Sequence, residues 1–180
     1  FRDSDGLWEE YDVMEVATPE AWNANPTLVL DFYNKRREQV LNAQPNSAHA
    51  DIAGLDTKYD VTVITQNIDD LHERSGSKNV LHLHGQITQS RSSVHENLIY
   101  ELNGGQIKIG DLCESGAQLR PNIVWFGEEV PNISIAQEIV SQADILLIVG
   151  TSLNVYPAAG LIHCADFRVK KIIVDPKYVH

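Results

Sequence analysis

The stretch from Val61 to Gly85 constrains the fold more than any other part of the chain. It begins with an apolar, β-branched run, Val61–Ile64, which predicts a buried strand. A second short strand is expected at Val80–Leu83. Between them, Asp69 and Asp70 can cap a helix that begins directly after these residues. Strand, helix and strand in this order predict two parallel strands of an α/β sheet.

Polar side chains gather just beyond the carboxyl ends of both expected strands. Gln66, Asn67 and Asp69 follow the first strand, and His84 follows the second. In open α/β sheets this edge is where ligands bind. Taken singly, each residue also fits a polar loop, a helix cap or a surface histidine, but together they favour a binding site. His82 and His84 point to the same face of the strand, yet a metal pair is disfavoured because no third ligand is evident.

Composition limits the class of protein. With 180 residues, 43% of them hydrophobic and 22% charged, the chain suits one soluble globular domain, or one domain with a small insertion. A net charge of −11 argues against binding nucleic acid by phosphate neutralisation. No apolar run reaches the roughly 18 residues of a membrane span, and no signal peptide opens the chain. With only two cysteines, a reducing cytoplasm is expected, and we expect a monomer.

Further elements follow from helix-start signals and apolar runs. Thr18 before Pro19 predicts a helix start, and Asn25-Pro26 predicts a second helix that runs to about Leu41. The remaining expected elements are helices at 47–55, 134–142 and 157–164, and parallel strands at 144–149 and 170–176.

Three motifs carry a family resemblance. T-Q-N-I-D-D-L-H at 65–72, followed by L-H-G at 83–85, resembles the catalytic core of the sirtuins, which are NAD-dependent protein lysine deacylases. L-R-P-N-I-V-W-F-G-E at 119–128 and G-T-S-L-N-V-Y-P at 150–157 are similar to further sirtuin motifs. The similarity covers nearly the whole chain. It implies an α/β fold, with a Rossmann-like parallel sheet, helices on both faces and a small inserted domain.

The resemblance implies that NAD is consumed as a co-substrate and that nicotinamide and O-acyl-ADP-ribose are released. Asn67 would hold the nicotinamide-side ribose with support from Gln66, and Asp69 would bind the carboxamide. His84 would be the general base, since imidazole titrates near neutrality. Relatives commonly carry Glu at the position of His82, so no role is carried over to it. The other implied cofactor-binding residues are Phe1, Arg2, Ile68, Gly150, Thr151, Ser152 and Asp175, where Asp175 replaces the usual Asn.

The expected partners are acyl-lysine proteins or peptides. A-T-P at 17–19 with F-Y-N-K-R-R at 32–37 resembles the sirtuin subgroup that removes succinyl and malonyl groups from lysine. There, Tyr33 and Arg36 would bind the acyl carboxylate and the small Ala17 would open the pocket. Without the resemblance, the same residues fit an ordinary amphipathic helix with Arg36 at the surface. The acyl-lysine channel would be lined by Val124, Trp125, Phe126 and Gly127.

The segment 86–118 departs from the family pattern. Sirtuins usually place two C-x-x-C pairs there, which form a structural zinc site. This segment offers Cys113 alone, so we predict no structural zinc. In its place we expect a compact hairpin that pairs 96–102 with 106–109. The candidate core of this module consists of Ile99, Leu102, Ile107 and Ile109.

The expected organisation is a Rossmann-like NAD-binding domain of residues 1–85 and 119–180, with the insertion at 86–118. The helical segment 17–55 would contribute to the acyl pocket. In sirtuins a strand and a Gly-rich turn precede the F-R pair, so we expect these 180 residues to be a fragment without activity alone. Two alternatives stay open: a protein ADP-ribosyltransferase on the same scaffold, and a non-catalytic module that binds NAD or acyl-lysine.

Overall fold

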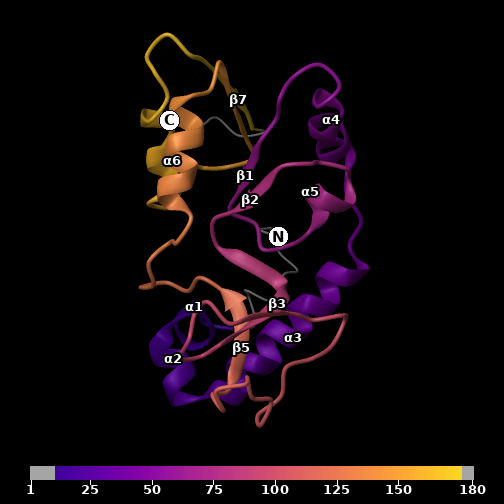
Figure 1. Cartoon of the computed structure of the whole chain (residues 1–180), viewed down its shortest axis with the longest axis vertical. Helices are drawn as coiled ribbons and strands as arrows, with labels where there is room; N and C mark the ends of the chain where they lie inside the picture. Colours follow the sequence, from indigo (N-terminus) through magenta and orange to yellow (C-terminus); the bar gives the residue numbers. More distant parts are fainter. Residues whose placement is uncertain (1–10, 176–180) are drawn as a thin grey trace.

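The computed structural model describes residues 11–175, which form two lobes (Figure 1). The lower lobe of the figure holds α1 (Val13–Val16), α2 (Pro19–Ala24), α3 (Pro26–Asn42), β3 (Gly85–Ser92), β4 (Ile99–Glu101) and β5 (Leu119–Ile123). The upper lobe holds α4 (Ser47–Leu55), β1 (Val63–Thr65), α5 (Leu71–Arg74), β2 (Val80–His82), α6 (Ile133–Ser141), β6 (Ile145–Val149), the 3₁₀ helix η2 (Ala158–His163) and β7 (Lys170–Val174). The chain passes from the lower to the upper lobe between α3 and α4, returns to the lower lobe at His84, and passes to the upper lobe again after β5.

The upper lobe is built on parallel strands, as predicted. β1 pairs with β2, with Thr65 opposite His82, and β6 pairs with β7, with Val149 opposite Val174. Among residues 11–175 these are two separate two-stranded sheets. In Figure 1 the strands lie between α6 on one side and α4 on the other. This arrangement is the Rossmann-like α/β architecture expected from the alternation of strands and helices.

The predicted helix starts are confirmed at atomic detail. The Thr18 hydroxyl accepts a hydrogen bond from Ala21 N–H at the start of α2, and the Asn25 side chain accepts from Leu28 N–H at the start of α3. Before α5, Asp70 occupies the capping position, but Asp69 Oδ1 accepts the hydrogen bond from Leu71 N–H at 3.1 Å. Short polar side chains therefore satisfy the donors that a helix start leaves open.

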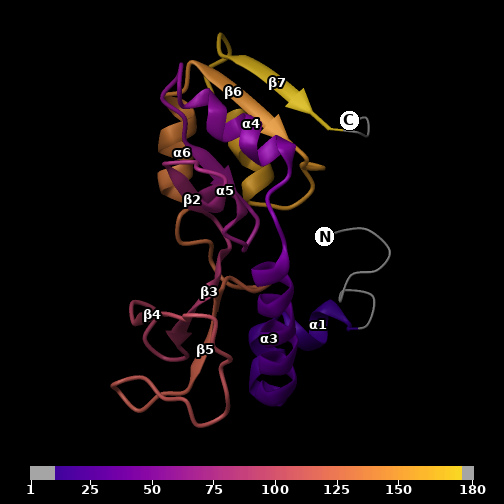
Figure 2. The same cartoon turned by 90° about the vertical axis from the view of Figure 1, so that its right-hand side faces the viewer.

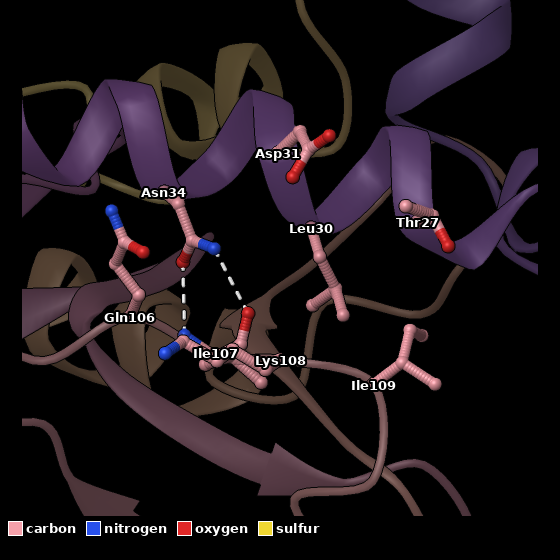
Figure 3. Close-up of a pocket in the computed structure, with 8 residues that line it drawn as sticks. All are labelled: Thr27, Leu30, Asp31, Asn34, Gln106, Ile107, Lys108 and Ile109. Carbon is pink, nitrogen blue, oxygen red and sulfur yellow. Dashed lines mark hydrogen bonds between the residues drawn. The ribbon is translucent and has the colours of Figure 1, made fainter.

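The hairpin predicted within 86–118 is wrong. The lower lobe instead contains an antiparallel sheet in the order β4-β3-β5, so β4 pairs with β3 and residues 106–109 form no strand. The physical reason lies in α3. The Asn34 side chain accepts from Ile107 N–H at 3.0 Å and donates to Ile107 O at 2.9 Å (Figure 3). The backbone groups that a hairpin would have used are thus bound by a side chain.

The expected core of this module is only partly correct. Ile107 is buried, whereas Ile99 and Ile109 are exposed. Ile87 of β3 and Ile123 of β5 instead pack in one buried cluster with Val29, Phe32 and Val40 of α3. Figure 2 shows α3 running alongside β3 and β5. The helical segment and the inserted sheet therefore share one core, which fixes α3 against β5.

None of the helices within residues 11–175 combines the length and the apolar character that crossing a bilayer requires.

Candidate active site

The loop after β1 is fixed by hydrogen bonds between its backbone groups and nearby side chains. Asn67 N–H donates to Thr65 Oγ1 at 3.0 Å. His84 Nδ1 lies 3.1 Å from Gln66 O, and His82 Nδ1 lies 3.0 Å from Asn67 O. The Asn67 residue is nevertheless exposed. Its amide is thus presented on a fixed backbone, and an amide can both donate to and accept from ribose hydroxyls.

Asp69 and Ile68 connect this loop to the lower lobe. Asp69 is buried, and its carboxylate binds the start of α5. Ile68 O accepts a hydrogen bond from Ile87 N–H of β3 at 2.8 Å, and the Ile68 side chain packs against the lower-lobe core. The loop is therefore anchored to both lobes.

The second group of predicted cofactor residues follows β6 and β7. Gly150 adopts a φ of 61°, and its N–H donates to Val174 O at 2.9 Å. Since Val149 pairs with Val174, Gly150 and Asp175 emerge side by side at the carboxyl end of this sheet. Gln66 Nε2 lies 3.4 Å from Thr151 Oγ1, which brings the two groups together across the lobe. Ser152 is next along the chain and half-buried.

The geometry of His84 suits a proton acceptor. A carbonyl oxygen only accepts, so Nδ1 carries the proton that is donated to Gln66 O, and Nε2 keeps its lone pair. No residue within 11–175 forms a hydrogen bond to that Nε2. Burial lowers the pKa of His84, and the hydrogen bond to Gln66 O opposes this only in part. The ring is therefore neutral at physiological pH.

The residues predicted to bind acyl-lysine also lie close together. Ala17, Tyr33 and Trp125 belong to one buried cluster. Phe126 N–H donates to Ala17 O at 3.0 Å, and Val124 N–H donates to His84 O at 3.0 Å. The turn that ends at Gly127, with a φ of 89°, is thus tied to Ala17 on one side and to the backbone of His84 on the other.

Arg36 is buried rather than at the surface. Burial lowers the pKa of Arg36, while the nearby Tyr33 and Asp69 favour its charged form. Burial also raises the pKa of Tyr33. A charged guanidinium and a protonated phenol therefore lie close together on α3, with Tyr33 in the same cluster as Trp125 and with Asp69 near Arg36.

Two predicted residues lie outside the described range, namely Phe1 and Arg2. Within the described range, no group of three or more His, Cys, Asp or Glu side chains could hold a metal ion. Cys113 Sγ contacts Ser115 Oγ at 3.0 Å and Ser92 Oγ at 3.4 Å instead.

A cavity of about 480 Å³ lies between α3 and the segment 106–109 (Figure 3). None of the predicted site residues lines it. Leu30 and Ile109 face it, and the Asn34 amide beside it is already bound to Ile107.

Sequence reasoning missed the residues that support the site. Glu128 and Arg120 stand inside the quoted L-R-P-N-I-V-W-F-G-E motif but received no role. Arg91 had no signal at all, because its partner Glu128 lies 37 positions further along the chain. The spacing of His82 to His84 is visible in the sequence, but it does not indicate Glu73, which lies 2.7 Å from His82 Nε2.

The fold and the site define an α/β protein of the Rossmann-like class, with polar residues of two parallel strand pairs converging at one edge. Comparison with known proteins refines this class. Residues 1–157 match the Sir2 family, and the chain belongs to that family.

Curated relatives and solved structures agree. The chain is 51% identical over 177 residues to an NAD-dependent protein deacylase of Helicobacter pylori strain J99, covering 98% of the chain and 75% of the relative. It is 50% identical over 184 residues to one of Bacteroides thetaiotaomicron, covering 99% and 79%. A Sir2 homologue solved with NAD superimposes with a TM-score of 0.89 at 40% identity, covering 99% of this chain and 72% of that one.

A more distant structure is that of Sir2 in complex with an inhibitor, 2′-O-acetyl-ADP-ribose and a deacetylated peptide. It matches with a TM-score of 0.76 at 31% identity, covering 94% of this chain and 75% of that one.

Proposed function

We propose that this Sir2-family protein, an NAD-dependent protein deacylase, removes succinyl and malonyl groups from lysine in addition to acetyl groups. One observation carries the assignment of the site. The His84 ring binds the cofactor-side loop at Gln66, and the His84 carbonyl binds the W-F-G turn at Val124. A single residue therefore stands between the two segments that would hold the two substrates.

The residues present fit NAD. Asn67 offers an exposed amide on a fixed loop, and Gln66 reaches Thr151 across the carboxyl ends of the strands. A Cβ placed on Gly150 would meet no atom within 4 Å, so the turn is open on this side. Asn67 and Gln66 would hold the ribose, Asp69 the carboxamide, and Gly150, Thr151, Ser152 and Asp175 the remainder. When bound, NAD supplies the ribose carbon to which the acyl oxygen bonds as nicotinamide leaves.

His84 acts as general base in this proposal. The fixed Nδ1–H leaves Nε2 as the acceptor, and the lowered pKa keeps the ring neutral. A neutral imidazole can take a proton from a ribose hydroxyl near neutral pH. Asp69 and Trp125 are both buried, which limits access of water to the same region.

Tyr33 and Arg36 provide the acyl preference. The guanidinium is suited to bidentate recognition of a carboxylate, and the phenol can add one hydrogen bond. The small Ala17 lies in the same buried cluster as Tyr33, where it takes up less space than a larger side chain would. An uncharged acetyl group cannot use the charge-assisted contacts, so it gains less from this arrangement.

The test uses the full-length protein with two matched peptides, succinyl-lysine and acetyl-lysine, and measures NAD-dependent nicotinamide release. Faster release with succinyl-lysine would support the proposal, whereas faster release with acetyl-lysine would overturn the acyl preference alone. Absence of release with both peptides would contradict the deacylase assignment. Labelled ADP-ribose that becomes attached to protein would then indicate a transferase, and NAD binding without chemistry would indicate a binding module.

Variants of two α3 residues test whether this helix determines the preference for succinyl-lysine. Tyr33→Phe and Arg36→Gln should lower kcat/KM for succinyl-lysine by about 30-fold or more, the size expected for losing a buried charge-assisted contact. The acetyl-lysine reaction should keep its rate. Lys35→Gln is the matched control, because Lys35 is exposed on the same helix. Equal losses for both peptides would show that the variants damage the fold.

A further inference from the structure

The Nδ1 atoms of His82 and His84 bind the backbone carbonyls of two consecutive loop residues. The two histidines differ in what surrounds the other ring nitrogen, Nε2. Nδ1 of each donates to the loop, at 3.0 Å to Asn67 O and at 3.1 Å to Gln66 O. His82 Nε2 lies 2.7 Å from Glu73 Oε1, whereas the Nε2 of His84 is left open by the described part of the chain. The two histidines therefore have different tasks.

We propose that His82, held by Glu73, is a positioning residue that fixes the Asn67 backbone for NAD binding. This inference rests on the proposed function, because the role of Asn67 toward the ribose is part of it. His82 acts through Asn67 and touches no substrate itself, since it is only 5% exposed.

The peptide groups on both sides of Asn67 are fixed by β1 and β2 together. Its N–H binds Thr65 Oγ1, and its carbonyl binds His82 Nδ1. Thr65 and His82 are opposite each other in the parallel pair, so both contacts come from one rigid unit. The backbone of Asn67 is thus fixed, while the residue itself is exposed. Loss of the carbonyl contact would let the amide turn away while the sheet stays intact.

Glu73 determines the orientation of the His82 ring. The Nε2 atom lies 2.7 Å from the Glu73 carboxylate, which is within hydrogen-bond distance. A hydrogen bond to a carboxylate is charge-assisted and stronger than a neutral one. His72 of α5 also interacts electrostatically with His82, and Asp69 and His49 in turn face His72. Glu73 is the carboxylate in direct contact.

Two substitutions separate the two contacts of the ring. In His82→Asn, the amide NH₂ takes the place of Nδ1, so the bond to Asn67 O can be kept and the Glu73 contact is lost. In His82→Gln, the amide reaches the place of Nε2, so the Glu73 contact can be kept and the Asn67 bond is lost. His95→Gln is the matched control, because His95 is exposed on the lower lobe.

The experiment measures NAD binding by calorimetry and the steady-state constants for NAD and the acyl peptide. We expect His82→Gln to weaken NAD binding by about fivefold or more, the size of one lost hydrogen bond. His82→Asn should weaken it less, and the KM for the acyl peptide should stay within error in both. A thermal melt of each variant, read beside the control, separates lost binding from lost folding.

Each outcome decides between the alternatives. If the parent protein binds NAD and His82→Gln binds it equally well, the positioning role is overturned while the proposed function stands. If His82→Asn weakens NAD binding as much as His82→Gln, the contact to Asn67 is not what matters, and the inference also fails. If the parent protein binds no NAD, the proposed function fails first and the inference with it.

Discussion

The carboxylate of Glu128 accepts two hydrogen bonds from the guanidinium of Arg120, at 2.7 Å to Oε1 and 3.0 Å to Oε2. The same carboxylate accepts from Arg91 at 3.2 Å and from Trp125 N–H at 2.8 Å. The Arg120 guanidinium lies 3.2 Å from the ring centroid of Trp125. Both arginines are 6% exposed. One carboxylate therefore offsets two buried cations and fixes the W-F-G turn.

Replacing this carboxylate should destabilise the fold. Glu128→Gln keeps the shape but leaves two buried guanidiniums without a counter-charge, which typically costs about 3–5 kcal/mol. We expect a lower melting temperature and a raised KM for the acyl peptide, because the turn proposed to bind it loses support. Glu129→Gln is the matched control, since Glu129 is the next residue and is exposed. Equal melting temperatures for the two variants would contradict the prediction.

The contact of Glu128 with the two arginines also predicts that the folded state loses stability at acidic pH. Burial alone would raise the pKa of Glu128, but the hydrogen bonds from Arg120 and Trp125 N–H and the charges of Arg120 and Arg91 outweigh it and lower the pKa. Stability from this group is therefore present above the unfolded value of about 4.3 and is lost as pH falls through the folded pKa. In denaturant titrations between pH 6 and 3, Glu128→Gln should remove part of this loss. An unchanged pH dependence would contradict it.

The sequence allowed the helix starts and the parallel strands to be predicted well because their signals are local. Thr18, Asn25 and the apolar runs act within a few residues of where they stand. The hairpin could not be predicted correctly because the decisive contact, Asn34 to Ile107, spans 73 positions. The ion network of Glu128 depends likewise on Arg91, 37 positions away. The residues of the candidate site could be named from motifs, but the side chains that hold them depend on tertiary packing.

Gly85 should be intolerant of a side chain. Its φ is 81°, and a Cβ there would meet the Asn122 carbonyl of β5. Gly85→Ala must therefore push β3 from β5 beside His84, and we expect a large loss of both stability and deacylation. Gly104→Ala is the control, because Gly104 has a φ of 76° with open space around it. It should cost only the strain of a left-handed residue, about 1–2 kcal/mol. Similar melting temperatures for both variants would refute the steric argument.

The pH profile should report His84. Because burial lowers the pKa of His84 below its ordinary value of about 6.5, the acid limb of kcat/KM should lie below pH 6.5. His84→Asn should abolish turnover while the thermal melt at pH 8 is retained, and His95→Asn should leave turnover unchanged. An acid limb above pH 7, or turnover that survives His84→Asn, would remove His84 as the base.

The same group makes a separate prediction for stability. As pH falls, His84 is protonated in the unfolded chain before it is protonated in the folded protein. The free energy of unfolding therefore decreases below about pH 6.5, and this loss levels off below the pKa of the folded state. His84→Asn removes this contribution and should flatten the dependence between pH 7 and 5. The measurement is urea denaturation at several pH values, where parallel curves for parent and variant would contradict the assignment.

Asn34 should couple the segment 106–109 to α3, which carries Tyr33 and Arg36, the residues proposed to bind the acyl carboxylate. Its amide binds both backbone groups of Ile107, and its Oδ1 also accepts from Arg37 at 2.7 Å. Asn34→Ala leaves the Ile107 N–H and C=O and one Arg37 donor without this partner, which should cost about 1–3 kcal/mol. Asp31→Ala is the control, because Asp31 lies one turn earlier on α3 and is exposed (Figure 3). Since Tyr33 and Arg36 flank this contact on α3, the succinyl-lysine reaction should weaken more than the acetyl-lysine reaction. Equal effects on the two peptides would show that the segment 106–109 does not position Tyr33 and Arg36.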